Sequence, residues 1–87
     1  MFVILFYDFG EKRVAKALKI CRKYLTWVQN SVFEGEITKG NFKKLKMELT
    51  SKMVKEEDSL IIYTFSSTKY SNKEIIGLAK NKPTVFF

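Results

Sequence analysis

Two runs of consecutive apolar residues stand out in the hydropathy pattern of this chain. The first covers residues 2–7 and is followed closely by Asp8 and Gly10; the second covers residues 60–65. A strand with one solvated face alternates apolar and polar residues, so an unbroken run predicts a strand buried on both faces. Because an ionised carboxylate inside such a strand is costly, we expect Asp8 just beyond the end of the first strand.

An amphipathic helix is predicted over residues 11–25. Its apolar positions recur at helical spacing, at Val14, Leu18, Cys21 and Leu25. Lysines recur at the same spacing on another face, at Lys12, Lys16, Lys19 and Lys23. Four ammonium groups one turn apart can follow the phosphates of a nucleic acid, although such a stripe is also typical of a solvated helix surface.

A second helix is predicted to begin near Thr38 or Asn41, since either side chain can cap its N-terminus. Its apolar stripe consists of Phe42, Leu45, Leu49 and Met53. Its outer surface carries Lys39, Lys43, Lys46, Lys52 and Lys55. We expect the acidic residues 56–58 to stop this helix and to lie in solvent at its end.

Strand-forming residues are also concentrated in residues 26–37, but Asn30 and Ser31 in the middle are typical of a turn. This pattern predicts two short strands joined by a tight turn. Residues 66–72 are predicted to be a polar loop. Residues 73–79 fit either a short helix or a strand, and residues 84–87 predict a short apolar strand at the C-terminus.

The predicted order is strand, helix, two strands, helix and strand, followed by an extra C-terminal strand pair. This is the ferredoxin-like, split βαβ pattern of the α+β class, in a single domain over residues 1–87. Its two helices cover one face of the sheet, yet both central strands are apolar on both faces. We therefore expect a homodimer that buries the second face, with the terminal strand closing onto the partner's sheet.

The charge of the chain favours a polyanionic partner. Sixteen lysines and arginines against nine acidic residues give a net charge of +7 in 87 residues, which suggests a nucleic acid. The chain has no histidine, which excludes Cys-His and Ser-His catalysis, and its one cysteine, Cys21, is expected to be a small core residue. No apolar stretch reaches the length of a membrane span, so we expect a cytoplasmic protein with no membrane partner.

Asp8 is the candidate for chemistry, and two roles are open to it. Glu11 follows three residues later, which is the spacing of a helix capping box. Alternatively, Asp8 binds a metal: one carboxylate is a poor magnesium site, but a two-fold axis near the strand end would bring two copies together. Such a pair could hold a divalent ion against a phosphodiester.

Three segments carry a resemblance to a known family. The first strand ends in Tyr7 and Asp8, the first helix begins with residues 13–15 (Arg-Val-Ala), and residues 29–35 read Gln-Asn-Ser-Val-Phe-Glu-Gly. In these motifs, and along its whole length, the chain resembles the Cas2 family of small CRISPR-associated proteins, which work with the CRISPR integrase during spacer acquisition.

The resemblance implies a ferredoxin-like homodimer in which Asp8 of each copy holds Mg²⁺ or Mn²⁺. It implies endonuclease activity on single-stranded RNA, double-stranded DNA or both, with Tyr7 and Arg13 near the site and Phe33 supporting it. It also implies that residues 73–79 form a strand. One departure is Trp27, where several members carry an arginine, so that a phosphate contact is missing here.

The sequence is compatible with three functions. The chain is either a metal-dependent endonuclease, or a structural adaptor that binds DNA on Lys12, Arg13, Lys16, Lys19 and Lys23 and bridges integrase dimers, or both. The third is a ribonuclease toxin of the virulence-associated protein D type, which shares the fold and the early aspartate. An RNA-recognition module is disfavoured, because its aromatic signature is missing from the predicted central strands.

Overall fold

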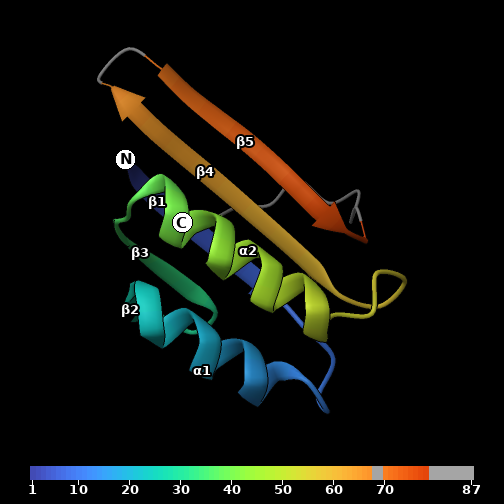
Figure 1. The fold of residues 1–87 in the computed structure, drawn as a ribbon. Helices are drawn as coiled ribbons and strands as arrows, with labels where there is room; N and C mark the ends of the chain where they lie inside the picture. Colours follow the sequence, from blue (N-terminus) through green and yellow to red (C-terminus); the bar gives the residue numbers. More distant parts are fainter. Residues whose placement is uncertain (68–69, 79–87) are drawn as a thin grey trace.

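A computed structural model describes residues 1–67 and 70–78 of the chain. Its elements are β1 (Phe2–Asp8), α1 (Val14–Tyr24), β2 (Thr26–Gln29), β3 (Val32–Glu36), α2 (Lys39–Lys52), β4 (Ser59–Ser67) and β5 (Tyr70–Gly77). The strands form one sheet in the order β2-β3-β1-β4-β5, and every neighbouring pair is antiparallel (Figure 1). The first four strands have the ferredoxin-like order, and β5 extends the sheet beyond β4, which confirms the predicted fold class.

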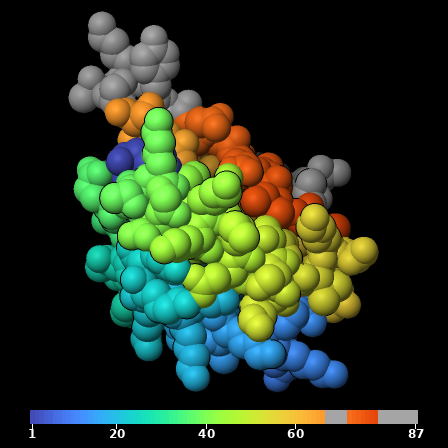
Figure 2. All heavy atoms as spheres, in the orientation of Figure 1, coloured from blue at the N-terminus to red at the C-terminus, as the bar shows by residue number. Residues whose placement is uncertain are grey.

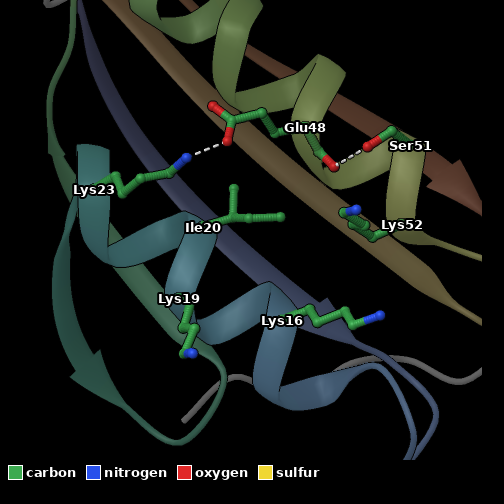
Figure 3. A pocket seen from close by; sticks show the side chains of 7 residues that line it. All are labelled: Lys16, Lys19, Ile20, Lys23, Glu48, Ser51 and Lys52. Carbon is green, nitrogen blue, oxygen red and sulfur yellow. Dashed lines mark hydrogen bonds and ion pairs between the residues drawn. The ribbon is translucent and has the colours of Figure 1, made fainter.

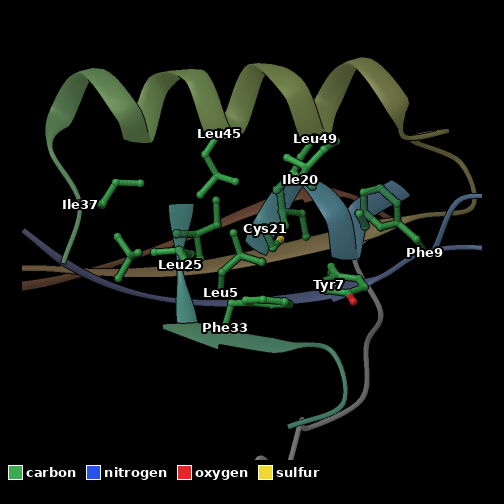
Figure 4. Packing of buried hydrophobic residues seen from close by; sticks show 14 residues of the cluster. Leu5, Tyr7, Phe9, Ile20, Cys21, Leu25, Phe33, Ile37, Leu45 and Leu49 are labelled. Carbon is green, nitrogen blue, oxygen red and sulfur yellow. The ribbon is translucent and has the colours of Figure 1, made fainter. Parts of the chain in front are cut away.

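Both helices pack on the same face of the sheet, and this decides which residues of β1 are buried. Leu5 and Tyr7 lie on the helix side of the sheet (Figure 4), and they are buried together with Val3. The alternate residues Phe2, Ile4 and Phe6 are half-buried. The prediction that β1 is buried on both faces is therefore wrong within one chain. The unbroken apolar run arises because both faces of this strand are apolar, not because one chain covers both.

Helix α1 begins at Val14, three residues later than predicted, because residues 11–13 form a turn. Of the predicted apolar positions, Cys21 and Leu25 are buried and Leu18 is half-buried. Ala17, Ile20 and Cys21 are buried, while the predicted core position Val14 is 37% exposed. The prediction for Cys21 is confirmed, and burial raises the pKa of its thiol to about 12.

Helix α2 follows its prediction closely. The Thr38 side chain caps the helix by accepting a hydrogen bond of 3.1 Å from the backbone N–H of Asn41. Leu45 and Leu49 are fully buried, so the predicted apolar stripe faces the core. The helix ends at Lys52, so the acidic residues 56–58 lie in the connection to β4 rather than at a helix end.

The predicted turn at Asn30 is present, and Asn30 adopts a positive φ of 46° between β2 and β3. The predicted polar loop over residues 66–72 is largely wrong, because β4 and β5 extend into it as a long antiparallel ribbon. Residues 73–77 belong to strand β5, as the family resemblance implies. The predicted strand over residues 84–87 lies outside the described residues. None of the described helices has the length and apolar character needed to cross a membrane.

Candidate functional site

Asp8 is the last residue of β1, where it pairs with Ser59 of β4 and is exposed to solvent. The sequence placed it just beyond the strand, so the prediction was off by one residue. Side chains alternate along a strand, so Asp8 faces away from the helices while Tyr7 faces toward them. Asp8 therefore lies at one end of the sheet face opposite the helix layer.

Tyr7 and Phe33 support this strand end from the core side. Their rings stack with centroids 6.2 Å apart, and Tyr7 meets Phe9 edge-on at 5.9 Å. Burial is the main cause that raises the pKa of Tyr7 above its ordinary value. The structure thus brings Tyr7 and Phe33 together beneath the site, on the opposite face of the sheet from the Asp8 carboxylate.

The capping role considered for Asp8 is wrong. The N-cap position of α1 is Arg13, five residues after Asp8, and it makes no side-chain capping hydrogen bond. The backbone N–H groups of Arg13 and Val14 donate instead to the carbonyl oxygen of Gly10, at 2.8 and 3.0 Å. A backbone turn therefore takes the place that the Asp8–Glu11 spacing suggested for a capping box.

Asp58 is a site residue that the sequence analysis missed. Its side chain is fully buried, which contradicts the prediction that residues 56–58 are all solvated. It accepts hydrogen bonds from the backbone N–H of Gly10 at 2.7 Å and of Val54 at 2.8 Å. The Arg13 guanidinium adds Nε to Oδ2 at 2.6 Å and Nη2 to Oδ1 at 3.0 Å.

These donors explain the electrostatics of the Asp58 carboxylate. The hydrogen bonds from Arg13 are the largest cause that lowers its pKa to about 2, with Val54 and Gly10 contributing further. The same contact raises the pKa of Arg13. No sequence signal could have revealed the pairing, because Arg13 lies 45 residues away from Asp58.

Arg13 has further consequences for the predicted site. Its side chain is 18% exposed, and besides Asp58 it contacts the exposed Glu57, at 3.2 Å from Nη2. Its guanidinium therefore points into the connection between α2 and β4. Nucleic acid binding by Arg13 stays a prediction, and the structure gives its charge two intramolecular partners.

The predicted lysine stripe lies on the helix layer. Lys16, Lys19 and Lys23 are on α1, whereas Lys12 precedes the helix. In the space-filling view, side chains of α1 and α2 cover this side of the molecule (Figure 2). A surface hollow between the two helices is lined by Lys16, Lys19, Ile20, Lys23, Glu48, Ser51 and Lys52 (Figure 3).

One of these lysines is partly neutralised. Lys23 donates to Glu48 (Figure 3), and Glu48 also accepts a hydrogen bond from Tyr24. The hydrogen bond from Lys23 is the largest cause that lowers the pKa of Glu48. Lys16, Lys19 and Lys52 therefore carry most of the positive charge at the hollow.

Within residues 1–67 and 70–78, no group of three or more His, Cys, Asp or Glu side chains is arranged to hold a metal ion. The ladder partner of Asp8 is Ser59, and the carboxylate of Asp58, the residue before that serine, is enclosed by its own donors. In this single chain, Asp8 is thus the carboxylate that the strand end offers to solvent. Trp27, at the position of the missing arginine, is 52% exposed and donates from Nε1 to the Asn30 carbonyl at 2.9 Å.

The sequence is closely similar to proteins of one family. A model of the family described as CRISPR associated protein Cas2 matches residues 1–73. The chain is 50% identical over 82 residues to the CRISPR-associated endoribonuclease Cas2 of Dictyoglomus turgidum, and the match covers 94% of each protein. It is 49% identical over 87 residues to the protein of that name from Thermotoga maritima, with 100% of both covered.

Solved structures agree with the sequence matches. A protein described as cas2 superposes with a TM-score of 0.72 at 38% identity, covering 100% of this chain and 98% of the other. Streptococcus pyogenes Cas2, crystallised at pH 6.5, superposes with a TM-score of 0.69 at 33% identity, covering 76% of this chain and 87% of the other. The match of the family model, the identity along the whole chain and the shared fold together show that this chain belongs to the CRISPR-associated Cas2 family.

Proposed function

We propose that the chain is a homodimeric, divalent-metal-dependent endonuclease that acts on phosphodiesters and takes part in spacer acquisition. The observation that carries this proposal is the position of Asp8, exposed at the end of β1 on the sheet face away from the helices. Relatives that are 50% and 49% identical are named endoribonucleases, which supports RNA as the first substrate to test. Membership of the Cas2 family also argues against the alternative function of a ribonuclease toxin.

The homodimer is supported by the residues on that sheet face. Side chains directly opposite each other in the ladders share a face, which groups Phe2 with Phe65, Ile4 with Tyr63, and Phe6 with Ile61 and Ile75. We call this set the apolar sheet face. Its members are half-buried or exposed, and Ile75 is 47% exposed. A second copy packed there would bury a matching apolar face and bring the two strand ends that carry Asp8 toward each other.

The residues present fit a shared Mg²⁺ or Mn²⁺ ion. These ions prefer oxygen ligands and are often held by one or two carboxylates together with phosphate oxygens, which two Asp8 side chains and a nucleic acid strand would supply. A bound divalent ion lowers the pKa of water and stabilises the developing negative charge. In this proposal Asp8 holds and orients the ion, while Tyr7 and Phe33 keep the strand end rigid from the core.

Cleavage assays with a matched control test this function. We expect the purified chain to cut single-stranded RNA or duplex DNA with Mg²⁺ and not without it. Asp8→Asn should fold and bind nucleic acid, but its cleavage rate should fall by orders of magnitude, since both copies of the carboxylate are lost. Glu11→Gln removes an equal charge three residues away and should cut normally. Cleavage by Asp8→Asn at the normal metal-dependent rate would contradict the proposal.

A second role, as a DNA-binding bridge for the CRISPR integrase, is supported by a different observation. Lys16, Lys19 and Lys52 lie together at the hollow between α1 and α2, on the opposite side of the sheet from Asp8. Lysines that follow phosphates bind nucleic acid without reading its sequence. This surface and the Asp8 site would therefore function independently, and a chain without cleavage activity would still bind.

A further inference from the structure

The Asp58 side chain links the connection after β1 to the connection before β4. These two segments are far apart in the sequence, and both lie near Asp8. Its side chain accepts from Gly10 and Arg13 in the connection after β1, and from Val54 in the connection before β4. We call these contacts the Asp58 clamp. Ser59, the next residue, is the ladder partner of Asp8. The clamp is therefore next to Asp8 in two ways: Gly10 follows Asp8 on its own segment, and Asp58 precedes the ladder partner of Asp8 on β4.

Gly10 is part of the geometry of this clamp. A Cβ atom at position 10 would lie 2.5 Å from Nη2 of Arg13 and 3.5 Å from Oδ1 of Asp58. The absence of a side chain at Gly10 leaves room for the guanidinium, and the backbone N–H of Gly10 donates to the same carboxylate at 2.7 Å. The backbone after Asp8 therefore contacts the Asp58 carboxylate directly.

The clamp begins where the sheet ends. The β1–β4 ladder ends at the pair of Asp8 and Ser59. Gly10, two residues after Asp8, donates its backbone N–H to Asp58. Between them, Phe9 is buried and contacts Tyr7. Asp8 is the last residue of this ladder, so what holds the segment that follows it helps to set its direction. That segment is anchored by the buried Phe9 and by the Asp58 clamp.

We infer that Asp58 is a positioning residue for Asp8: through Gly10 and Arg13 it sets the direction in which the Asp8 carboxylate leaves the end of the sheet. This inference rests on the proposed function, in which Asp8 holds the divalent ion. Residues that orient a metal ligand commonly change metal affinity or activity by about 10- to 100-fold when they are replaced. Asp58 would act in this way through the backbone, without contacting the substrate.

Adjacent residues provide a matched pair of variants. Asp58→Asn and Glu57→Gln remove the same charge from neighbouring positions, and both acidic residues contact Arg13. Glu57 is 66% exposed, and the backbone N–H of Gly10 donates to Asp58 rather than to Glu57, so Glu57→Gln should retain normal cleavage. Asp58→Asn should lower kcat and weaken Mn²⁺ binding to the free dimer, each by about tenfold or more, while KM for the nucleic acid stays unchanged.

Added metal separates positioning from a general loss of structure. If the Asp8 carboxylates are misplaced in a folded protein, raising the Mn²⁺ concentration should restore part of the lost kcat in Asp58→Asn. A partly unfolded protein would lose nucleic acid affinity as well and would gain nothing from the metal. Normal kcat and normal Mn²⁺ affinity in a folded Asp58→Asn dimer would overturn the inference.

Arg13→Lys covers the case in which Asp58→Asn does not fold. Lysine keeps the positive charge but cannot donate to both carboxylate oxygens in the planar geometry of arginine, so it should produce a smaller loss of kcat with KM unchanged. An Arg13→Lys protein with normal kcat and Mn²⁺ affinity would also contradict the inference. Asp8→Asn is assayed beside them: if it is inactive while the clamp variants are normal, the inference alone fails, and if it cuts normally, the proposed function fails and the inference with it.

Discussion

At the residue scale, one buried carboxylate determines how the chain is connected around its candidate site. Asp58 accepts four hydrogen bonds, two from backbone N–H groups and two from Nε and Nη2 of Arg13. Burying a charged group is costly unless it is paired and hydrogen-bonded, and here both conditions are met. The contrast with the exposed Glu57 beside it shows that residue type alone does not reveal the role.

The depressed pKa of Asp58 predicts how stability depends on pH. Its ordinary pKa of 3.8 applies to the unfolded chain, and its folded pKa is about 2. Between these values the unfolded state binds more protons, so the free energy of unfolding should fall as the pH is lowered from about 4 toward 2. Above pH 4 this contribution should be fully present.

Acid titrations of the free energy of unfolding, from denaturant melts, check this prediction. The decline in stability below pH 4 should be reduced in Asp58→Asn and kept in Glu57→Gln. A remaining slope is expected in both variants, since the pKa of Glu48 is also lowered. An Asp58→Asn protein with the same acid dependence as the original chain would show that the carboxylate is not held as the structure describes.

At the element scale, the two helices contribute separate surfaces. Their inner faces complete the core, with Ile20 and Leu49 among the buried residues, and their outer edges line the lysine hollow. The lysines of α1 were predicted as a stripe on one helix, and the structure adds Lys52 from α2 beside them. Two helices that are separated in sequence therefore form one basic surface.

The salt dependence of nucleic acid binding tests this surface. Each phosphate contact contributes about 0.9 to the slope of log affinity against log salt for duplex DNA, so Lys16→Gln combined with Lys19→Gln should reduce the slope by about 2. Lys39→Gln combined with Lys43→Gln changes the charge equally on exposed positions that are not at the hollow. This control should leave the slope nearly unchanged. Equal effects of the two pairs would show that binding follows net charge rather than the hollow.

At the scale of the whole molecule, the described helices cover one face of the sheet. The apolar sheet face lies on the other, where Glu34, Glu36 and Lys73 border it. Aromatic pairs are already formed on the apolar sheet face, with Phe6 against Tyr63 at 5.9 Å and Phe2 against Phe65 at 6.4 Å. A face of this kind is a typical site of protein association. The proposed homodimer would bury it and would place two Asp8 side chains near the same two-fold axis.

Light scattering at micromolar concentration checks the dimer. The chain should have twice its monomer mass of 10.2 kDa. Ile4→Glu puts a charge at the centre of the apolar sheet face and should shift the equilibrium toward monomer, because an uncompensated charge would be buried in each half of the interface. Lys43→Glu, at an exposed position on α2, is the control and should remain a dimer. A monomeric original chain would contradict both the dimer and the shared metal site.

The sequence by itself determined the features that depend on neighbouring residues. The order of the elements, the turn at Asn30 and the Thr38 cap all follow from interactions within about four residues, and periodicity is sufficient to predict them. The family resemblance also came from contiguous motifs, and residues 73–77 were settled as strand by that resemblance rather than by their own pattern.

The tertiary structure alone decided the contacts between distant segments. An apolar run does not reveal which of its faces the helices cover, and the helix layer turns Tyr7 inward and Asp8 outward. The start of α1 depends on a turn at Gly10 that is held by Asp58, a residue 48 positions later. Aspartate is mostly exposed in folded proteins unless it is paired, and Asp58 is buried here because folding brings a guanidinium and two backbone donors to it.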